Sequence, residues 1–158
     1  MLGGAALYLQ FREHVAEAGQ DAAALIRPAV AAIELQRPVD LILDLRFDEG
    51  EAPGPTLEFV RSLPQRVGGR VYVLIGRYTF ASGLVSAAAA KKAGGDRVVI
   101  VGESPGDRLR FWIGGGRTCL PHSGFCLHHS DGLVDLERGC RGTDGCYGDR
   151  FDATIGSL

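Results

Sequence analysis

Apolar residues in this chain fall into short runs separated by longer segments of helical spacing. Continuous or alternating apolar runs predict strands, whereas apolar residues three or four positions apart predict helices. Four runs are expected to be strands: Ala6–Phe11, Leu41–Leu45, Val71–Gly76 and Val98–Val101. Three segments between them are expected to be helical: Ala16–Leu35, Leu57–Leu63 and Leu84–Lys92. This alternation predicts an α/β fold with a mainly parallel sheet.

Two prolines lie at or inside the expected helices. Pro28 interrupts Ala16–Leu35, so a kink or two shorter helices are expected, because proline removes a helical hydrogen bond. Pro64 follows Leu63 directly and is expected to end the second helix for the same reason.

The strand–helix–strand unit from Val71 to Glu103 is the centre of the predicted fold. Its first strand is almost wholly apolar, as expected of a strand that is buried on both faces of a parallel sheet. The helix is expected to begin near Ala81–Gly83, where the positive end of its dipole faces any bound group. The loop Phe47–Pro55 leaves the carboxyl end of the preceding strand, and this is the edge at which α/β sheets bind ligands.

Asp44 and Arg46 are polar residues at the end of the leucine-rich strand. A buried carboxylate usually needs a partner, so a structural ion pair between the two is favoured. A catalytic role for Asp44 is the alternative.

Beyond Gly102 the pattern changes to short strands and glycine-rich turns. Antiparallel hairpins attached to the edge of the main sheet are expected from Leu109–Ile113, Arg117–Leu120 and Gly124–His128. The periodicity fades after Ser130, which predicts a loop-rich tail. The chain is therefore expected to form a single domain, 1–158, with a core at 6–117 and a cysteine-containing hairpin and tail at 118–158.

All four cysteines lie in this hairpin and tail. The simplest arrangement pairs Cys119 with Cys126 and Cys140 with Cys146, because each pair flanks a short turn. Such disulfides would stabilise a segment that has little apolar content, and they imply an oxidising compartment. Free thiols are one alternative, and zinc is another, although the Cys-x-x-Cys spacing of structural zinc sites is missing. The nearby histidines are His122, His128 and His129.

Composition narrows the classes of function. The 158 residues are 46% hydrophobic and 23% charged, which is typical of one globular domain with a single core. The net charge of −2 comes with scattered Lys and Arg, so nucleic acid is not expected as a partner. No apolar run reaches the roughly 20 residues of a membrane span. No metal site or cofactor is expected either.

Three motifs occur in order between the expected elements: DLRFDEGE at the second strand, VLIGRYTFASG at the third strand and its helix, and VVIVGE at the fourth strand. Together they resemble the C-terminal processing, or tail-specific, family of serine peptidases over about residues 6–117. The segment CLPHSGFC resembles a leucine-proline-asparagine-serine-glycine segment in cysteine-bearing relatives. The resemblance implies a ClpP/crotonase-like ββα superhelix and peptide hydrolysis by acyl transfer.

The resemblance also assigns roles to residues at the helix start. The family's nucleophile position aligns with Ala81, and a methyl group cannot attack a carbonyl. Ser82 is the best available nucleophile, with a helix N-cap as its alternative role. Gly50 and the amide of Ser82 or Gly83 are implied as the two donors of the oxyanion hole. Three explanations for alanine at position 81 are considered: an engineered inactivation, a natural loss of catalysis, and a nucleophile that is Ser82 instead.

This sequence departs from the family's pattern at two further places, the catalytic base and the loop after the second strand. The lysine that many family members carry after Gly-Glu has no counterpart, so the resemblance implies a base from an upstream domain or an oligomer partner. Lys91 and Lys92 are expected to be solvated on the central helix. Asp48 and Glu51 replace the Asn and second Gly of the family loop, which puts carboxylates beside a site meant to stabilise negative charge.

The expected function is that of a serine endopeptidase acting on peptides or proteins, incomplete or inactivated as the chain stands. The alternative is a non-catalytic peptide-binding module of the same fold, and a crotonase-type acyl-CoA enzyme is a third candidate. The paired cysteines favour a periplasmic or secreted location, while Met1–Ala5 is too short for a signal-peptide core.

Overall fold

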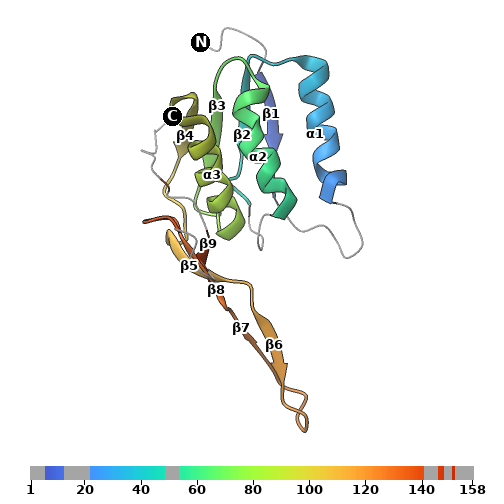
Figure 1. Ribbon diagram of the computed structural model, residues 1–158, viewed down its shortest axis with the longest axis vertical. Coiled ribbons are helices and arrows are strands. Elements are labelled where there is room, and N and C mark those ends of the chain that lie inside the picture. The colour runs from blue at the N-terminus through green and yellow to red at the C-terminus, as the bar shows by residue number, and fades with distance from the viewer. Residues whose placement is uncertain (1–5, 13–21, 49–53, 141–145, 148–150, 152–158) are drawn as a thin grey trace.

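The computed structural model describes residues 6–12, 22–48, 54–140, 146–147 and 151 (Figure 1). Its main sheet contains four parallel strands in the order β1-β2-β3-β4. The strands are β1 (Ala6–Gln10), β2 (Asp40–Asp44), β3 (Val71–Ile75) and β4 (Val98–Gly102). The predicted α/β fold with a parallel sheet is confirmed, and each strand end lies within one residue of its expected position.

Three helices connect these strands: α1 (Ala22–Gln36), α2 (Gly54–Arg66) and α3 (Ala81–Gly94), the last followed by a 3-10 turn, η1 (Gly95–Arg97). All three pack on one face of the sheet, because the buried core combines residues of every helix with alternate residues of each strand. Along β3, Val71, Val73 and Ile75 are buried in this core, whereas Tyr72 and Leu74 point to the other face and are half-buried. The expectation that β3 is buried on both faces is therefore wrong. Within the described ranges, no helix is long and apolar enough to cross a membrane.

Neither proline breaks its helix. α1 continues through the exposed Pro28, and Ala24, whose carbonyl loses its helical donor, is exposed as well, so water can replace that donor. α2 continues through Pro64, which is buried against α3. A Cβ at Gly94 would lie 2.8 Å from the Pro64 ring, so the two helices approach closely there. α2 therefore continues to Arg66 despite a proline that typically costs about 3 kcal/mol inside a helix, and the expected helix end at Leu63 is wrong.

A second, smaller sheet contains β5 (Arg110–Ile113), β8 (Gly132–Asp135) and β9 (Cys146–Tyr147) in the order β5-β8-β9. It is separate from the main sheet, so the expected attachment of this region to the main sheet's edge is wrong. The antiparallel hairpin expected from Arg117–Leu120 and Gly124–His128 is confirmed. Val134 and Leu136 are fully buried and form a core cluster with Leu84, Val85 and Ala88 of α3. The expected loop-rich tail is therefore wrong for residues 132–136, which pair with β5 and pack on α3.

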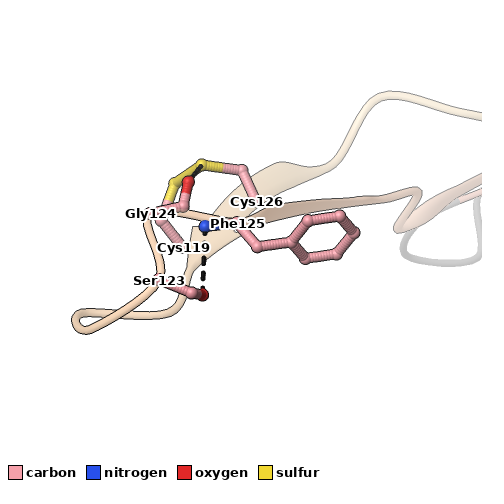
Figure 2. Close-up of a disulfide and its surroundings, with 5 residues drawn as sticks. All are labelled: Cys119, Ser123, Gly124, Phe125 and Cys126. Atoms are coloured by element: carbon pink, nitrogen blue, oxygen red, sulfur yellow. Dashed lines mark hydrogen bonds between the residues drawn. A yellow bond between two sulfur atoms is a disulfide. The ribbon is translucent and has the colours of Figure 1, made fainter.

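β6 (Gly116–Cys119) and β7 (Cys126–His129) form an antiparallel hairpin, hereafter the arm, which projects from the body of the molecule (Figure 1). The predicted disulfide between Cys119 and Cys126 is confirmed and closes the end of the arm (Figure 2). For this pair, the free-thiol and zinc alternatives are wrong. Cys140 is also disulfide-bonded, but the side chain of Cys146 lies outside the described residues, so this second pairing stays a prediction.

Removing the arm disulfide is expected to loosen the arm and leave the body folded. Closing so short a loop is worth about 2–3 kcal/mol of chain entropy, but the arm is exposed along most of its length, so it can open locally. The variant is Cys119→Ser with Cys126→Ser, since a reductant would also act on Cys140. Hydrogen exchange by mass spectrometry should accelerate at least about tenfold in residues 116–129 and stay unchanged in β2 and β3. Faster exchange throughout the main sheet would contradict this independence of the arm.

Candidate functional site

The candidate site lies where the carboxyl ends of β2 and β3 meet the start of α3. Thr79 holds these segments together: the Gly76 N–H donates to its Oγ1 at 2.9 Å, and that hydroxyl donates to the Leu45 carbonyl at 2.8 Å. Thr79 is fully buried, so both hydrogen bonds are shielded from water. The predicted helix start at Ala81–Gly83 is confirmed, since α3 begins at Ala81.

Asp48 ties the loop after β2 to the same helix. Its carbonyl accepts the N–H of Phe80 at 3.0 Å, and its Oδ1 accepts the hydroxyl of Ser82 at 3.4 Å. Asp48 and Ser82 are 0% and 1% exposed, so Ser82 Oγ is closed to solvent and to substrate in this conformation. Ser82 therefore anchors the loop, and this geometry gives no support to its expected role as nucleophile. The loop continues into Gly50 and Glu51, which lie outside the described residues, so the oxyanion role of Gly50 stays a prediction.

Gly83 is required by the close approach of that loop. A Cβ at this position would lie 3.0 Å from the Asp48 carbonyl oxygen and 2.9 Å from Thr79 Cγ2. Its N–H donates to the Phe80 carbonyl at 2.8 Å. The Gly83 amide, expected as an oxyanion donor, is thus used inside the first turn of α3. The amide of Ser82 is the candidate donor that is left on this side of the site.

Ala81 has an unusual backbone conformation for its residue type. Its φ of +32° lies in the left-handed region, where a Cβ costs about 1–2 kcal/mol. Ala81 is half-exposed, whereas residues 82–90 of α3 are all buried. A strained residue presented at a strand-to-helix turn is the arrangement by which hydrolases of the α/β class expose their nucleophile. Nothing in the sequence signals this strain, because alanine rarely adopts a positive φ.

The Gly-Glu pair after β4 borders the same edge of the sheet. Gly102 has a φ of +131°, and a Cβ there would lie 2.0 Å from the Ile75 carbonyl oxygen, so glycine is required. The Glu103 N–H donates to that carbonyl at 3.3 Å, and the Glu103 carboxylate lies 3.8 Å from the Arg77 guanidinium. The motif therefore packs β4 on β3 and supports the turn that leads to α3.

Asp44 is fully buried at the end of β2, and its carboxylate belongs to a structural network. Arg46 donates to it from its backbone N–H at 3.0 Å, from Nε at 3.0 Å and from Nη2 at 2.8 Å, and the Tyr8 hydroxyl also donates. Burial by itself raises the pKa of Asp44, but the hydrogen bonds from Arg46 and Tyr8 outweigh burial and lower the pKa to about 2. The hydrogen bond to Asp44 in turn raises the pKa of Tyr8. The predicted ion pair between Asp44 and Arg46 is confirmed.

Lys91 does not reach the candidate site. Its Nζ donates to the carbonyls of Gly95 and Val98 at 2.9 and 2.8 Å, at the far end of α3, so the expectation that it is merely solvated is wrong. Ten residues of helix, about 15 Å, separate it from Ala81. Lys91 therefore stabilises the junction between α3 and β4 and cannot act as a base at the helix start.

No protein-family model, curated protein or solved structure matches this chain. The likeness to the tail-specific peptidases accordingly depends on the three motifs and on their places in the fold. The described part of the first motif, residues 44–48, begins at the end of β2. TFASG spans the start of α3, and Gly102 ends β4, so these segments lie at one edge of the sheet.

Proposed function

We propose that this chain is the core of a serine-peptidase-like domain with a ClpP/crotonase-like fold, and that as it stands it binds peptides without hydrolysing them. The geometry at the start of α3 carries the proposal. Ala81, at the family's nucleophile position, has a strained and half-exposed backbone, while Ser82 is buried against Asp48. A site with the nucleophile's backbone conformation and without its hydroxyl supports recognition of a peptide rather than its cleavage.

The start of α3 offers what a peptide carbonyl needs. The first turn of a helix has amide groups without helical partners and the positive end of the helix dipole, and both favour a carbonyl oxygen. Phe80, the N-cap, has no side-chain hydrogen bond that would compete for these amides. In acyl transfer the same amides would stabilise an oxyanion, but that intermediate forms only after attack by a hydroxyl, which Ala81 lacks. Binding of the uncharged peptide carbonyl needs no such hydroxyl and is therefore favoured over formation of the intermediate.

Catalysis needs a hydroxyl and a base that act as a unit. In this proposal the base comes from an upstream domain or an oligomer partner. The hydroxyl is missing because alanine occupies position 81. The disulfide between Cys119 and Cys126 supports a periplasmic or secreted location for such a domain. The acyl-CoA candidate has no specific observation in its favour.

The unmodified chain is expected to bind an extended peptide and to resist a fluorophosphonate probe. Binding is measured by fluorescence anisotropy with fluorescein-labelled unstructured peptides, and labelling by intact mass. Ala81→Ser places a hydroxyl on the half-exposed turn but supplies no base. Its turnover of a quenched fluorogenic peptide is therefore expected to stay at or below roughly 10³-fold over water, the level that positioning and amide donors alone provide.

Ser82→Ala is the control for the neighbouring hydroxyl. Labelling of the unmodified chain that disappears in Ser82→Ala would contradict the proposal and identify Ser82 as the nucleophile. Failure of the unmodified chain to bind any peptide would contradict the binding function itself.

A further inference from the structure

Two exposed aromatic residues stack on each other beside the candidate site. The rings of Phe47 and Tyr78 lie 6.2 Å apart with an interplanar angle of 18°, and the two residues are 48% and 62% exposed. The Arg46 guanidinium lies 5.9 Å from the centre of the Phe47 ring. These three side chains form the aromatic platform. Neighbouring large apolar side chains at a surface indicate contact with a partner, whereas single ones do not.

Arg46, the charged member of the platform, is held in place by residues buried beneath it. Its Nε and Nη2 donate to the buried carboxylate of Asp44. Its Cγ lies 3.5 Å from the position of a Cβ at Gly76, so its aliphatic stem lies over the backbone at the end of β3. The guanidinium therefore stays beside Phe47 without a ligand.

The backbone on either side of the rings is equally well fixed. Phe47 directly precedes Asp48, and Tyr78 directly precedes Thr79; both of these residues are fully buried. The Asp48 carbonyl accepts the Phe80 N–H at 3.0 Å, and the Thr79 hydroxyl donates to the carbonyl of Leu45, the residue that follows β2. The platform is thus preorganised, so binding of a ligand there costs little entropy for ordering the protein side chains.

Among the residues that the structure describes, both arginines beside the rings are paired with a carboxylate. Arg46 pairs with Asp44 at 2.8 Å, and Arg77, which precedes Tyr78, lies 3.8 Å from Glu103. A surface with paired charges and aromatic faces favours an uncharged, flat side chain over a carboxylate. The chemistry therefore points to an aromatic residue of the ligand.

The platform lies close to the helix start. Tyr78 is three residues before Ala81, so their Cα atoms are at most about 11 Å apart. An extended peptide advances about 3.3 Å per residue. A side chain on the platform therefore belongs to a residue within about four positions of the peptide group bound at Ala81.

We infer that the aromatic platform binds an aromatic side chain of an extended peptide whose backbone lies at the start of α3. This inference rests on the proposed peptide-binding function and adds the class of peptide: one with Phe, Tyr or Trp a few residues from the bound carbonyl.

The test uses three fluorescein-labelled decapeptides of Gly and Ser with a central Phe, Ala or Asp. The unmodified chain is expected to bind the Phe peptide about tenfold more tightly than the Ala peptide, the effect of one stacked aromatic contact. The Asp peptide should bind no better than the Ala peptide. Phe47→Ala and Tyr78→Ala should each reduce the preference to about twofold or less, and Tyr78→Phe should retain it. Phe125→Ala, a matched change at a 62% exposed position on the arm, should leave the preference intact.

The outcomes separate this inference from the function on which it rests. Equal binding of the Phe and Ala peptides overturns the inference and leaves peptide binding standing. No binding of any of the three overturns both. Both Phe47→Ala and Tyr78→Ala can keep the preference for Phe while their melting temperatures match that of the unmodified chain. This result overturns the inference, because the aromatic subsite then lies elsewhere. Tighter binding of the Asp peptide overturns it by showing that the arginines rather than the rings select the ligand.

Discussion

Replacing Leu136 with alanine is expected to lower the free energy of unfolding by about 3 kcal/mol. Leu136 is 0% exposed and belongs to the same buried cluster as Leu84 and Val85 of α3. The truncation removes buried apolar atoms and leaves a cavity between the second sheet and the helix, and both effects destabilise the folded state. A loss of this size shows that residues 132–136 belong to the cooperative core although their sequence pattern predicts a loop.

Urea unfolding followed by far-ultraviolet circular dichroism measures this loss. Leu127→Ala is the matched control, because Leu127 is 58% exposed on the arm and the same atoms are removed. It is expected to change the free energy of unfolding by no more than about 0.5 kcal/mol. Equal small losses in the two variants would show that the second sheet unfolds independently of α3.

The main sheet could be predicted because each of its strands is an apolar run long enough to stand out. β8 could not, since Leu133 and Val134 are bracketed by glycine and aspartate, and the burial of Val134 depends on α3, which lies far away in sequence. The helix end at Pro64 was wrongly expected for a related reason. Local propensity disfavours a proline there, but its packing near Gly94 depends on a contact that no local pattern contains.

The position of the candidate site could be predicted as well, because the motifs mark strand ends and a helix start. The burial and backbone conformation of its residues could not be predicted. The burial of Ser82 and the positive φ of Ala81 go with hydrogen bonds that join residues distant in sequence, such as those of Asp48 and Thr79. A serine beside an aligned nucleophile position therefore looks reactive in the sequence and is an anchor in the fold.

Lowering the pH is expected to remove the contribution of Asp44 to stability. Hydrogen bonds from Arg46 and Tyr8 lower the pKa of Asp44 to about 2 in the folded chain, from an ordinary value of 3.8. A carboxyl group whose pKa falls on folding stabilises the folded state above its unfolded pKa, and this stabilisation is lost as the pH falls toward the folded pKa. The difference between the two pKa values corresponds to roughly 2 kcal/mol, lost between about pH 4 and pH 2.

Asp44→Asn isolates this contribution, because the amide keeps the shape of the side chain but carries no charge to pair with Arg46. At pH 7 the variant is expected to be about 2 kcal/mol less stable than the unmodified chain, and the gap should narrow to about 0.4 kcal/mol at pH 2, where about half of the native carboxyl is protonated. Urea unfolding at each pH gives both free energies. Asp96→Asn, at an exposed position in η1, is the control and should stay within about 0.5 kcal/mol of the unmodified chain throughout. A gap between Asp44→Asn and the unmodified chain that is constant down to pH 2 would show that the network stabilises the fold through packing and neutral hydrogen bonds rather than through the charge of Asp44.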